Sequence, residues 1–375
     1  MDAVLPCRSP SRFVKVRFGL WLPVVRVLPC RCSLTRSRTA VCSRVSDLRD
    51  AVFKSCARLA WSLWGELGVS TWDRRHQGWC VELEPLLAFT AVLGERERRL
   101  RREAVDWCIA NPAFVSLSQF RHVVSDPLWQ DEPAFADLSA TMTHLTGRKW
   151  PGSDRGRAYE LEPSGKSRLR ELSAPSLLQL RLRALFGVGS RAELVRLMLL
   201  NPSQEWSVAQ LGERIAYTQR QAATDLEMLA KGGLIEKRGG GPSRYALRDA
   251  SGLRVVVGEL PKLAPNWTPL FQVLAGVLAS LGLVADDRLR QPAVEMSRRL
   301  QRLEPALTAS GLPKPPGGLS TTPIDVARQW ILDIAGALGE GDPDVLTEQA
   351  SVQAPGDPPT GRGGWPRVPD QPLDS

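Results

Sequence analysis

The sequence predicts a mainly α-helical protein that carries one small β-hairpin. Apolar residues recur at three- and four-residue spacing through most of positions 47–338, which is the period of helices with one buried face. Ser-x-x-Gln and Thr-x-x-Gln pairs, which are typical of helix N-termini, precede two of these stretches. Two short runs flank a glycine-rich loop and predict the hairpin. We therefore expect a helical N-terminal domain, a central unit with the hairpin, and C-terminal helices.

The helical N-terminal domain is expected to span residues 47–140. Its first apolar stripe runs from Leu48 to Leu67 along one face of a long helix, and Gly68 ends it. Arginines and glutamates alternate over residues 95–103, which usually marks a solvated helix face. Between these helices, the aromatic segment from Trp72 to Trp79 could bind a ligand, but such tryptophans more often anchor a small helical core.

The first 46 residues are expected to form a basic, disordered tail. They hold nine Lys and Arg against one Asp, so they account for +8 of the net charge of +9. Their composition does not favour a packed core. The tail is a basic arm that adds affinity for DNA, a solvated extension, or upstream sequence translated from a misplaced start, and we favour the last two. An intact mass that includes residues 1–46 would exclude the misplaced start.

Two further segments are rich in Gly, Pro and Ser or Asp. Residues 141–176 are expected to form a linker between domains, and residues 341–375 are expected to be disordered.

The central unit is expected to span residues 177–258. A buried helix over Ser190–Leu200 stops at Asn201-Pro202, and a Ser207/Gln210 capping box opens a second, short helix. The third helix begins at a Thr218/Gln221 capping pair and closes at Lys231-Gly232-Gly233. The runs 234–238 and 244–248 then form the hairpin. The β-branched run 253–257 is interpreted as a further strand that pairs with it.

This order of elements resembles the winged helix-turn-helix domain of bacterial regulators of the MarR and ArsR type. Most of the resemblance lies in the segment 225–238, Asp-Leu-Glu-Met-Leu-Ala-Lys-Gly-Gly-Leu-Ile-Glu-Lys-Arg. In the family, leucines of the third helix pack inward and a Gly-Leu step leads into the wing. The resemblance gives these roles to Leu226, Leu229, Gly233 and Leu234, and it covers about 60 of the 375 residues.

The resemblance implies that the partner is double-stranded DNA, with the start of the third helix in the major groove. Arg220 could bridge guanine O6 and N7, and Gln219 or Gln221 could pair with adenine. Arg238 and Arg244 flank the wing, where they would contact phosphate or the minor groove. The implied function is a transcriptional regulator, either a repressor or an antitoxin-like protein. Its candidate DNA-binding residues are Thr218, Gln219, Arg220, Gln221, Thr224, Arg238 and Arg244.

An alternative from another class stays open, because winged helices also serve as protein-docking modules. Residues 190–249 hold nine Lys and Arg against seven Asp and Glu, which is a weakly basic balance for a DNA-binding unit. The apolar helices after Trp267 either form a homodimer or docking surface, or they complete the core of a monomer. The alternative function is an interaction adaptor that binds a protein partner through its helical domains.

The sequence offers no catalytic, cofactor or metal site, so we expect no enzyme. Residues 186–192 superficially resemble the Gly-Ser loop of nucleotidyltransferases, but the nearest downstream Asp is Asp225 and no Asp-x-Asp follows. Gly239–Gly241 lacks the Lys-Ser or Lys-Thr of a phosphate loop. The seven Cys and three His show no zinc-ligand spacing. Since no stretch of about 20 apolar residues occurs, we expect a cytoplasmic protein with no membrane partner.

Overall fold

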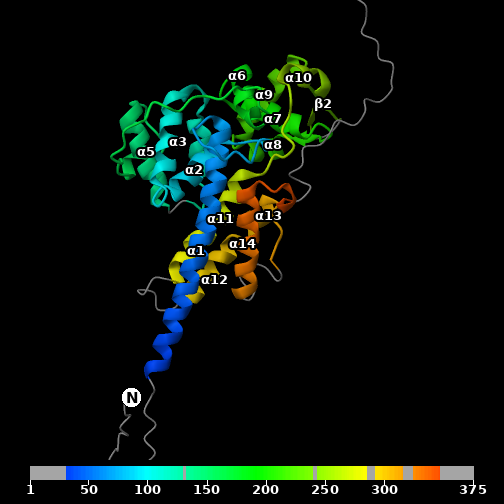
Figure 1. The fold of residues 1–375 in the computed structure, drawn as a ribbon. Coiled ribbons are helices and arrows are strands. Elements are labelled where there is room, and N and C mark those ends of the chain that lie inside the picture. Colours follow the sequence, from blue (N-terminus) through cyan, green and yellow to red (C-terminus); the bar gives the residue numbers. More distant parts are fainter. Residues whose placement is uncertain (1–30, 130–131, 240–242, 285–291, 316–323, 347–375) are drawn as a thin grey trace, which may run out of the picture. The chain divides into compact units, whose positions relative to one another are not determined.

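The computed structural model describes residues 31–129, 132–239, 243–284, 292–315 and 324–346, and these are mainly helical with one small antiparallel sheet (Figure 1). The elements, in chain order, are α1 (Arg31–Leu67), α2 (Leu83–Leu93), α3 (Arg98–Ala110), α4 (Leu117–Val124), α5 (Pro133–Thr146), α6 (Leu178–Phe186), α7 (Ser190–Leu200), β1 (Trp206–Ser207), α8 (Val208–Ile215), α9 (Gln219–Lys231), β2 (Ile235–Arg238), β3 (Arg244–Leu247), α10 (Ala250–Val257), α11 (Trp267–Val284), α12 (Pro292–Arg302), α13 (Glu304–Ser310) and α14 (Ile324–Glu340). Among the described helices, none is both long and apolar enough to cross a membrane.

The larger hydrophobic cluster, here called the large core, joins the N-terminal and C-terminal helices. Phe89 of α2 stacks on Phe271 of α11 with ring centroids 4.4 Å apart. Leu303 packs so close to Gly276 of α11 that a Cβ there would lie 2.5 Å from the leucine. The broad apolar face of α11 is therefore covered by α2, α12 and α13 of the same chain. The interpretation that these helices complete a core fits this packing.

Two boundaries expected from the sequence are displaced. Helix α1 begins at Arg31, inside the expected tail, whereas residues 1–30 lie outside the described residues. Helix α5 continues to Thr146, past the expected start of the linker. Residues 147–174 then run along the large core: Asp106 accepts hydrogen bonds from the backbone of Gly165 and Ser167 at 2.7 and 2.9 Å.

The second cluster, here called the small core, joins α6–α10 and the sheet. The strand order is β1-β3-β2, and both pairings are antiparallel, with Trp206 opposite Tyr245 and Ile235 opposite Leu247. The hairpin expected over 234–248 is thereby confirmed. Leu226 and Leu229 of α9 are buried in this cluster, because they share the helix face that packs on α7.

Two expectations for single segments are wrong. Residues 250–257 form helix α10 instead of a strand, since Asp249 caps the helix by accepting the Gly252 backbone N–H at 2.9 Å. Trp79 is buried in the large core as expected, but Trp72 is 99% exposed and anchors nothing. Aromatic content alone could not distinguish the two tryptophans.

Helix α6 lies between the two cores. Leu180 packs into the large core, whereas Leu178 and Leu182 pack into the small core. The arginine side chains that follow Leu180 and Leu182 are consequently also enclosed: Arg181 and Arg183 are both buried. The guanidinium of Arg181 donates to the carbonyl oxygens of Leu172 and Ala174 at 2.6 and 2.7 Å, which ties α6 to the segment before it.

Candidate nucleic-acid interface

The first two turns of α9 present the five helix residues that the sequence singles out. Thr218 is the N-cap, and its hydroxyl accepts the backbone N–H of Gln221 at 3.2 Å. All of the following are exposed: Thr218, Gln219, Arg220, Gln221 and Thr224. Arg220, Gln221 and Thr224 point outward because Ala222 and Leu226 bury another face of the helix in the small core, whereas Thr218 and Gln219 are exposed at the start of the helix.

Asp225 lies on the same helix but is turned inward. Its carboxylate is 6% exposed and accepts hydrogen bonds from Ser190 Oγ, from Gln221 Nε2 at 2.8 Å and from Arg191 Nε at 2.9 Å. Burial alone would raise the pKa of Asp225, but these hydrogen bonds more than offset it and hold the pKa below its ordinary value. The Asp225 carboxylate thus holds α9 against the start of α7 through its bonds to Ser190 and Arg191.

We expect Asp225→Asn to lower the free energy of unfolding by about 1 to 2 kcal/mol, because the amide loses the charge that three donors share. Urea denaturation monitored by circular dichroism measures this loss. Glu213→Gln is a matched control, since Glu213 is exposed on the neighbouring helix α8, and it should change stability by less than about 0.5 kcal/mol. Equal small losses in both variants would show that Asp225 does not fasten α9.

The hairpin brings Arg238 and Arg244 together. They are directly opposite in the β2–β3 register, so both side chains lie on one face of the sheet. Arg238 forms ion pairs with Glu205, at 2.9 Å, and with Glu236. Arg244 donates to Gln210 Oε1 at 3.2 Å. Residues 240–242 of the connecting loop lie outside the described residues.

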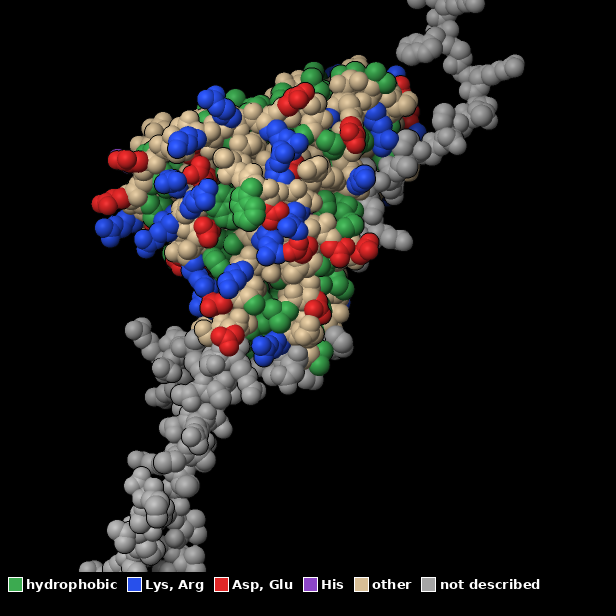
Figure 2. Space-filling view, in the orientation of Figure 1, with side chains coloured by type: hydrophobic (Ala, Val, Ile, Leu, Met, Phe, Trp, Pro, Cys, Tyr) green, Lys and Arg blue, Asp and Glu red, His purple; other side chains and the backbone are tan. Residues whose placement is uncertain are grey.

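The side chain of Glu227 joins α9 to the hairpin. Its Oε1 accepts from Lys237 Nζ at 2.9 Å and from Tyr245 Oη at 3.0 Å. These donors lower the pKa of Glu227, so the carboxylate stays ionised and its charge is balanced by Lys237. Three cations near α9, Arg191, Lys237 and Arg238, therefore have an acidic partner within the chain, and Figure 2 shows Lys and Arg interspersed with Asp and Glu over the visible face.

The turn between α8 and α9 is held by the N-terminal helices. Ala216 has φ +61°, and it is the one residue other than glycine with positive φ among those the structure describes. This left-handed conformation reverses the chain so that α9 leaves α8 at once. Gln119 of α4 donates from Nε2 to the Ile215 carbonyl at 3.3 Å, which fixes the turn against the large core.

A buried network of charges, which the sequence did not predict, joins α2, α6 and α7. Arg183 donates to both carboxylate oxygens of Glu84, at 2.8 and 2.9 Å, and to Glu193 at 2.7 Å. Arg196 continues the network to Glu193 and Glu82 at 2.8 and 2.6 Å. Arginines between leucines in the α6 sequence are typical of a solvated face, so no sequence signal indicated that Arg183 is 1% exposed.

No grouping of three or more His, Cys, Asp or Glu within the described ranges could hold a metal ion. The thiols of Cys56 and Cys80 are buried, and burial raises their pKa to about 12 and about 11.

Comparison of the chain with protein-family models, with curated proteins and with solved structures finds no match in any of the three.

Proposed function

We propose that residues 177–258 form a winged helix-turn-helix and that the protein is a sequence-specific regulator of transcription that binds duplex DNA. The observation that carries the proposal is the exposed polar start of α9, which stands beside a hairpin on the order α7-β1-α8-α9-β2-β3. A helix with one buried face and an exposed, hydrogen-bonding N-terminal end is suited to the major groove. A repressor or antitoxin-like protein would use such a unit.

The hydrogen bonds of the described residues rank the side chains that would read bases. Arg220 and Gln219 make no side-chain hydrogen bond within the described chain, so both are free to pair with base edges. The side-chain amide of Gln221 already donates one hydrogen bond to Asp225. Thr224 donates its hydroxyl to the Arg220 carbonyl at 3.0 Å, which leaves its methyl for a thymine methyl. We therefore propose Gln219 over Gln221 as the adenine contact.

Fluorescence anisotropy on a selected duplex and on random duplexes, over a range of salt, tests the proposal. Arg220→Ala should lower the preference for the selected duplex by about 1 to 3 kcal/mol. Arg244→Ala should weaken binding to all duplexes alike and reduce the salt slope by about 1, since it loses one phosphate contact.

Lys54→Ala is the control, since Lys54 is exposed on α1 and lies outside the proposed DNA-binding unit, and this variant should bind like the unmodified chain. Arg238→Ala should cost less than Arg244→Ala, because Arg238 must first leave Glu205 and Glu236. Unchanged binding in both Arg220→Ala and Arg244→Ala would refute this docking geometry.

The second candidate is an adaptor that binds a protein through the same unit. Two observations favour it: the ion pairs that Arg191, Lys237 and Arg238 form beside α9, and Met228, which is 49% exposed on that helix. A protein partner would be held by apolar contact, so its binding would depend little on salt. If no duplex shows a measurable, salt-dependent affinity, the adaptor becomes the better proposal.

A further inference from the structure

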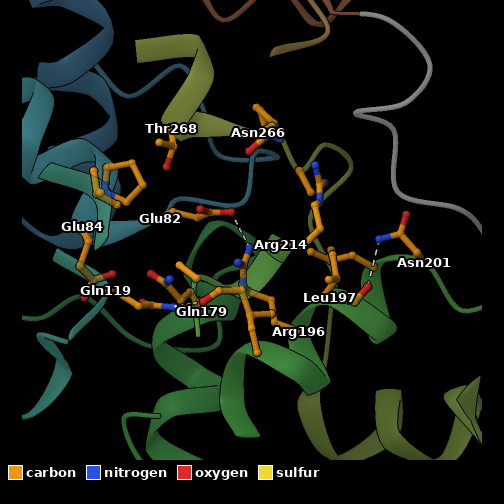
Figure 3. Close-up of a pocket in the computed structure, with 17 residues that line it drawn as sticks. Glu82, Glu84, Gln119, Gln179, Arg196, Leu197, Asn201, Arg214, Asn266 and Thr268 are labelled. Atoms are coloured by element: carbon orange, nitrogen blue, oxygen red, sulfur yellow. Dashed lines mark hydrogen bonds and ion pairs between the residues drawn. The ribbon is translucent and has the colours of Figure 1, made fainter. Parts of the chain in front are cut away.

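A small cavity of about 80 Å³ lies where α2, α4, α7 and α8 meet the segment before α11 (Figure 3). The space is several times the volume of about 10 to 15 Å³ that one water molecule needs in a cavity, so it can hold a small ligand. Thr268 and Asn266 line it on the α11 side, and Ile215 and Ala216 line it at the turn that leads into α9.

The cavity is lined by a buried cation whose hydrogen-bonding capacity is not used up. The Arg196 side chain is 8% exposed, and its Nε and Nη1 donate to Glu193 and Glu82. Its Nη2 donates to no oxygen acceptor among the residues the structure describes, and the guanidinium also contacts the buried Cys80 thiol. Arg214 also lines the cavity. It is exposed and forms no ion pair with an acidic residue among those the structure describes. Two guanidinium groups therefore line the same cavity.

The same cavity is lined by a carboxylate with an unused oxygen. Glu82 accepts from Arg196 through Oε1, whereas its Oε2 accepts no hydrogen bond within the described ranges. The carboxylates of Glu82, Glu84 and Glu193 balance the guanidinium groups of Arg183, Arg196 and Arg214. A bare anion or a bare cation would upset this balance, whereas a ligand that carries one charge of each sign would preserve it.

We propose that this cavity binds a small zwitterionic amino acid. Its carboxylate accepts hydrogen bonds from Arg214 and from Nη2 of Arg196, and its ammonium donates to Oε2 of Glu82. The proposal does not depend on DNA binding, because it rests on the cavity and its charges alone.

Isothermal titration calorimetry of the full chain with glycine, L-alanine and L-serine tests the proposal, with sodium acetate and methylamine as ligands of one charge. At least one amino acid should bind saturably and at least about tenfold more tightly than either of these, since each lacks one charged contact. Saturable binding by none of the amino acids, or equal binding by acetate, would overturn the proposal.

Arg214→Ala tests the site itself, because Arg214 is exposed and its loss should leave the fold intact. It should weaken amino-acid binding at least about tenfold, the effect of one lost charged contact. Arg121→Ala is the matched control: Arg121 is exposed on α4 but does not line this cavity, so binding should be unchanged. Equal affinities in the two variants would place the ligand elsewhere and overturn the assignment.

Discussion

Replacing Arg183 by methionine is expected to lower the free energy of unfolding by about 3 to 5 kcal/mol, the usual effect of removing one partner from a buried ion pair. The change leaves Glu84 buried without its bidentate partner and removes the bond to the Phe114 carbonyl at 2.6 Å. Burial opposes the charge on Arg183, but Glu84 and Glu193 outweigh it and raise the pKa of the guanidinium. The network is therefore strongly coupled, and urea denaturation measures the loss.

A double-mutant cycle separates this coupling from simple loss of packing. In the Arg183→Met background, Glu84→Gln should recover part of the lost stability, because it removes the orphaned charge. Arg96→Met is the control, since Arg96 pairs with Asp50 at 2.7 Å on the surface and should cost less than about 1 kcal/mol. If the effects of Arg183→Met and Glu84→Gln simply add, the two side chains do not stabilise one another.

Local patterns in the sequence predicted what local interactions decide. The Ser207/Gln210 capping box forms with both of its hydrogen bonds, because its partners are three residues apart and need no distant element. The Thr218/Gln221 pair is only half formed. Gln221 donates its backbone N–H to Thr218, but its amide bonds to Asp225, which is held by α7. A tertiary partner thus replaced the local one.

Contacts between distant segments could not be predicted in this way. Arg183 and Glu84 are far apart in the sequence, and each looks like an ordinary surface charge until α6 is placed between two cores. Residues 253–257 have the composition of a strand, but both edges of β3 are already occupied by β1 and β2, and the Asp249 cap starts a helix instead. The exposure of Arg220, Gln221 and Thr224 was predictable, because helical period places them away from Leu226; Gln219 shares the stripe of Leu226 and is exposed at the first position of α9.

His76 is the buried titratable group that links α1, the 71–79 segment and α14. Its Nε2 lies 2.9 Å from the Leu338 carbonyl, so this nitrogen must carry the proton. Its Nδ1 lies 2.8 Å from Ser62 Oγ, and it accepts from that hydroxyl. Burial lowers the pKa of His76 to about 4, and the hydrogen bond to Leu338 offsets only part of this effect. The neutral ring is the form that the fold requires.

Stability should therefore fall as the pH is lowered from 6.5 toward 4, since His76 takes up a proton in the unfolded chain near its ordinary pKa of 6.5 but in the folded chain only near 4. The full stabilisation is present above pH 6.5. Linkage gives a loss of about 2 kcal/mol between pH 7 and pH 5, and about 3 kcal/mol by pH 4. Urea denaturation at these pH values measures it.

The window from pH 7 to pH 5 separates His76 from the carboxylates whose pKa is lowered in the fold, whereas burial raises the pKa of Glu132, whose contribution to stability changes with pH in the opposite direction. The pKa values of Asp106, Glu193 and Asp225 are lowered in the fold, so the stability that these groups contribute is lost only as the pH falls below about 4.5. His76→Gln retains a donor for the Leu338 carbonyl and cannot titrate, so its stability should be nearly constant across this window. A slope equal to that of the unmodified chain would assign the pH dependence to other groups. A flat profile in both proteins would mean that water reaches His76 and that the end of α14 is not sealed against α1.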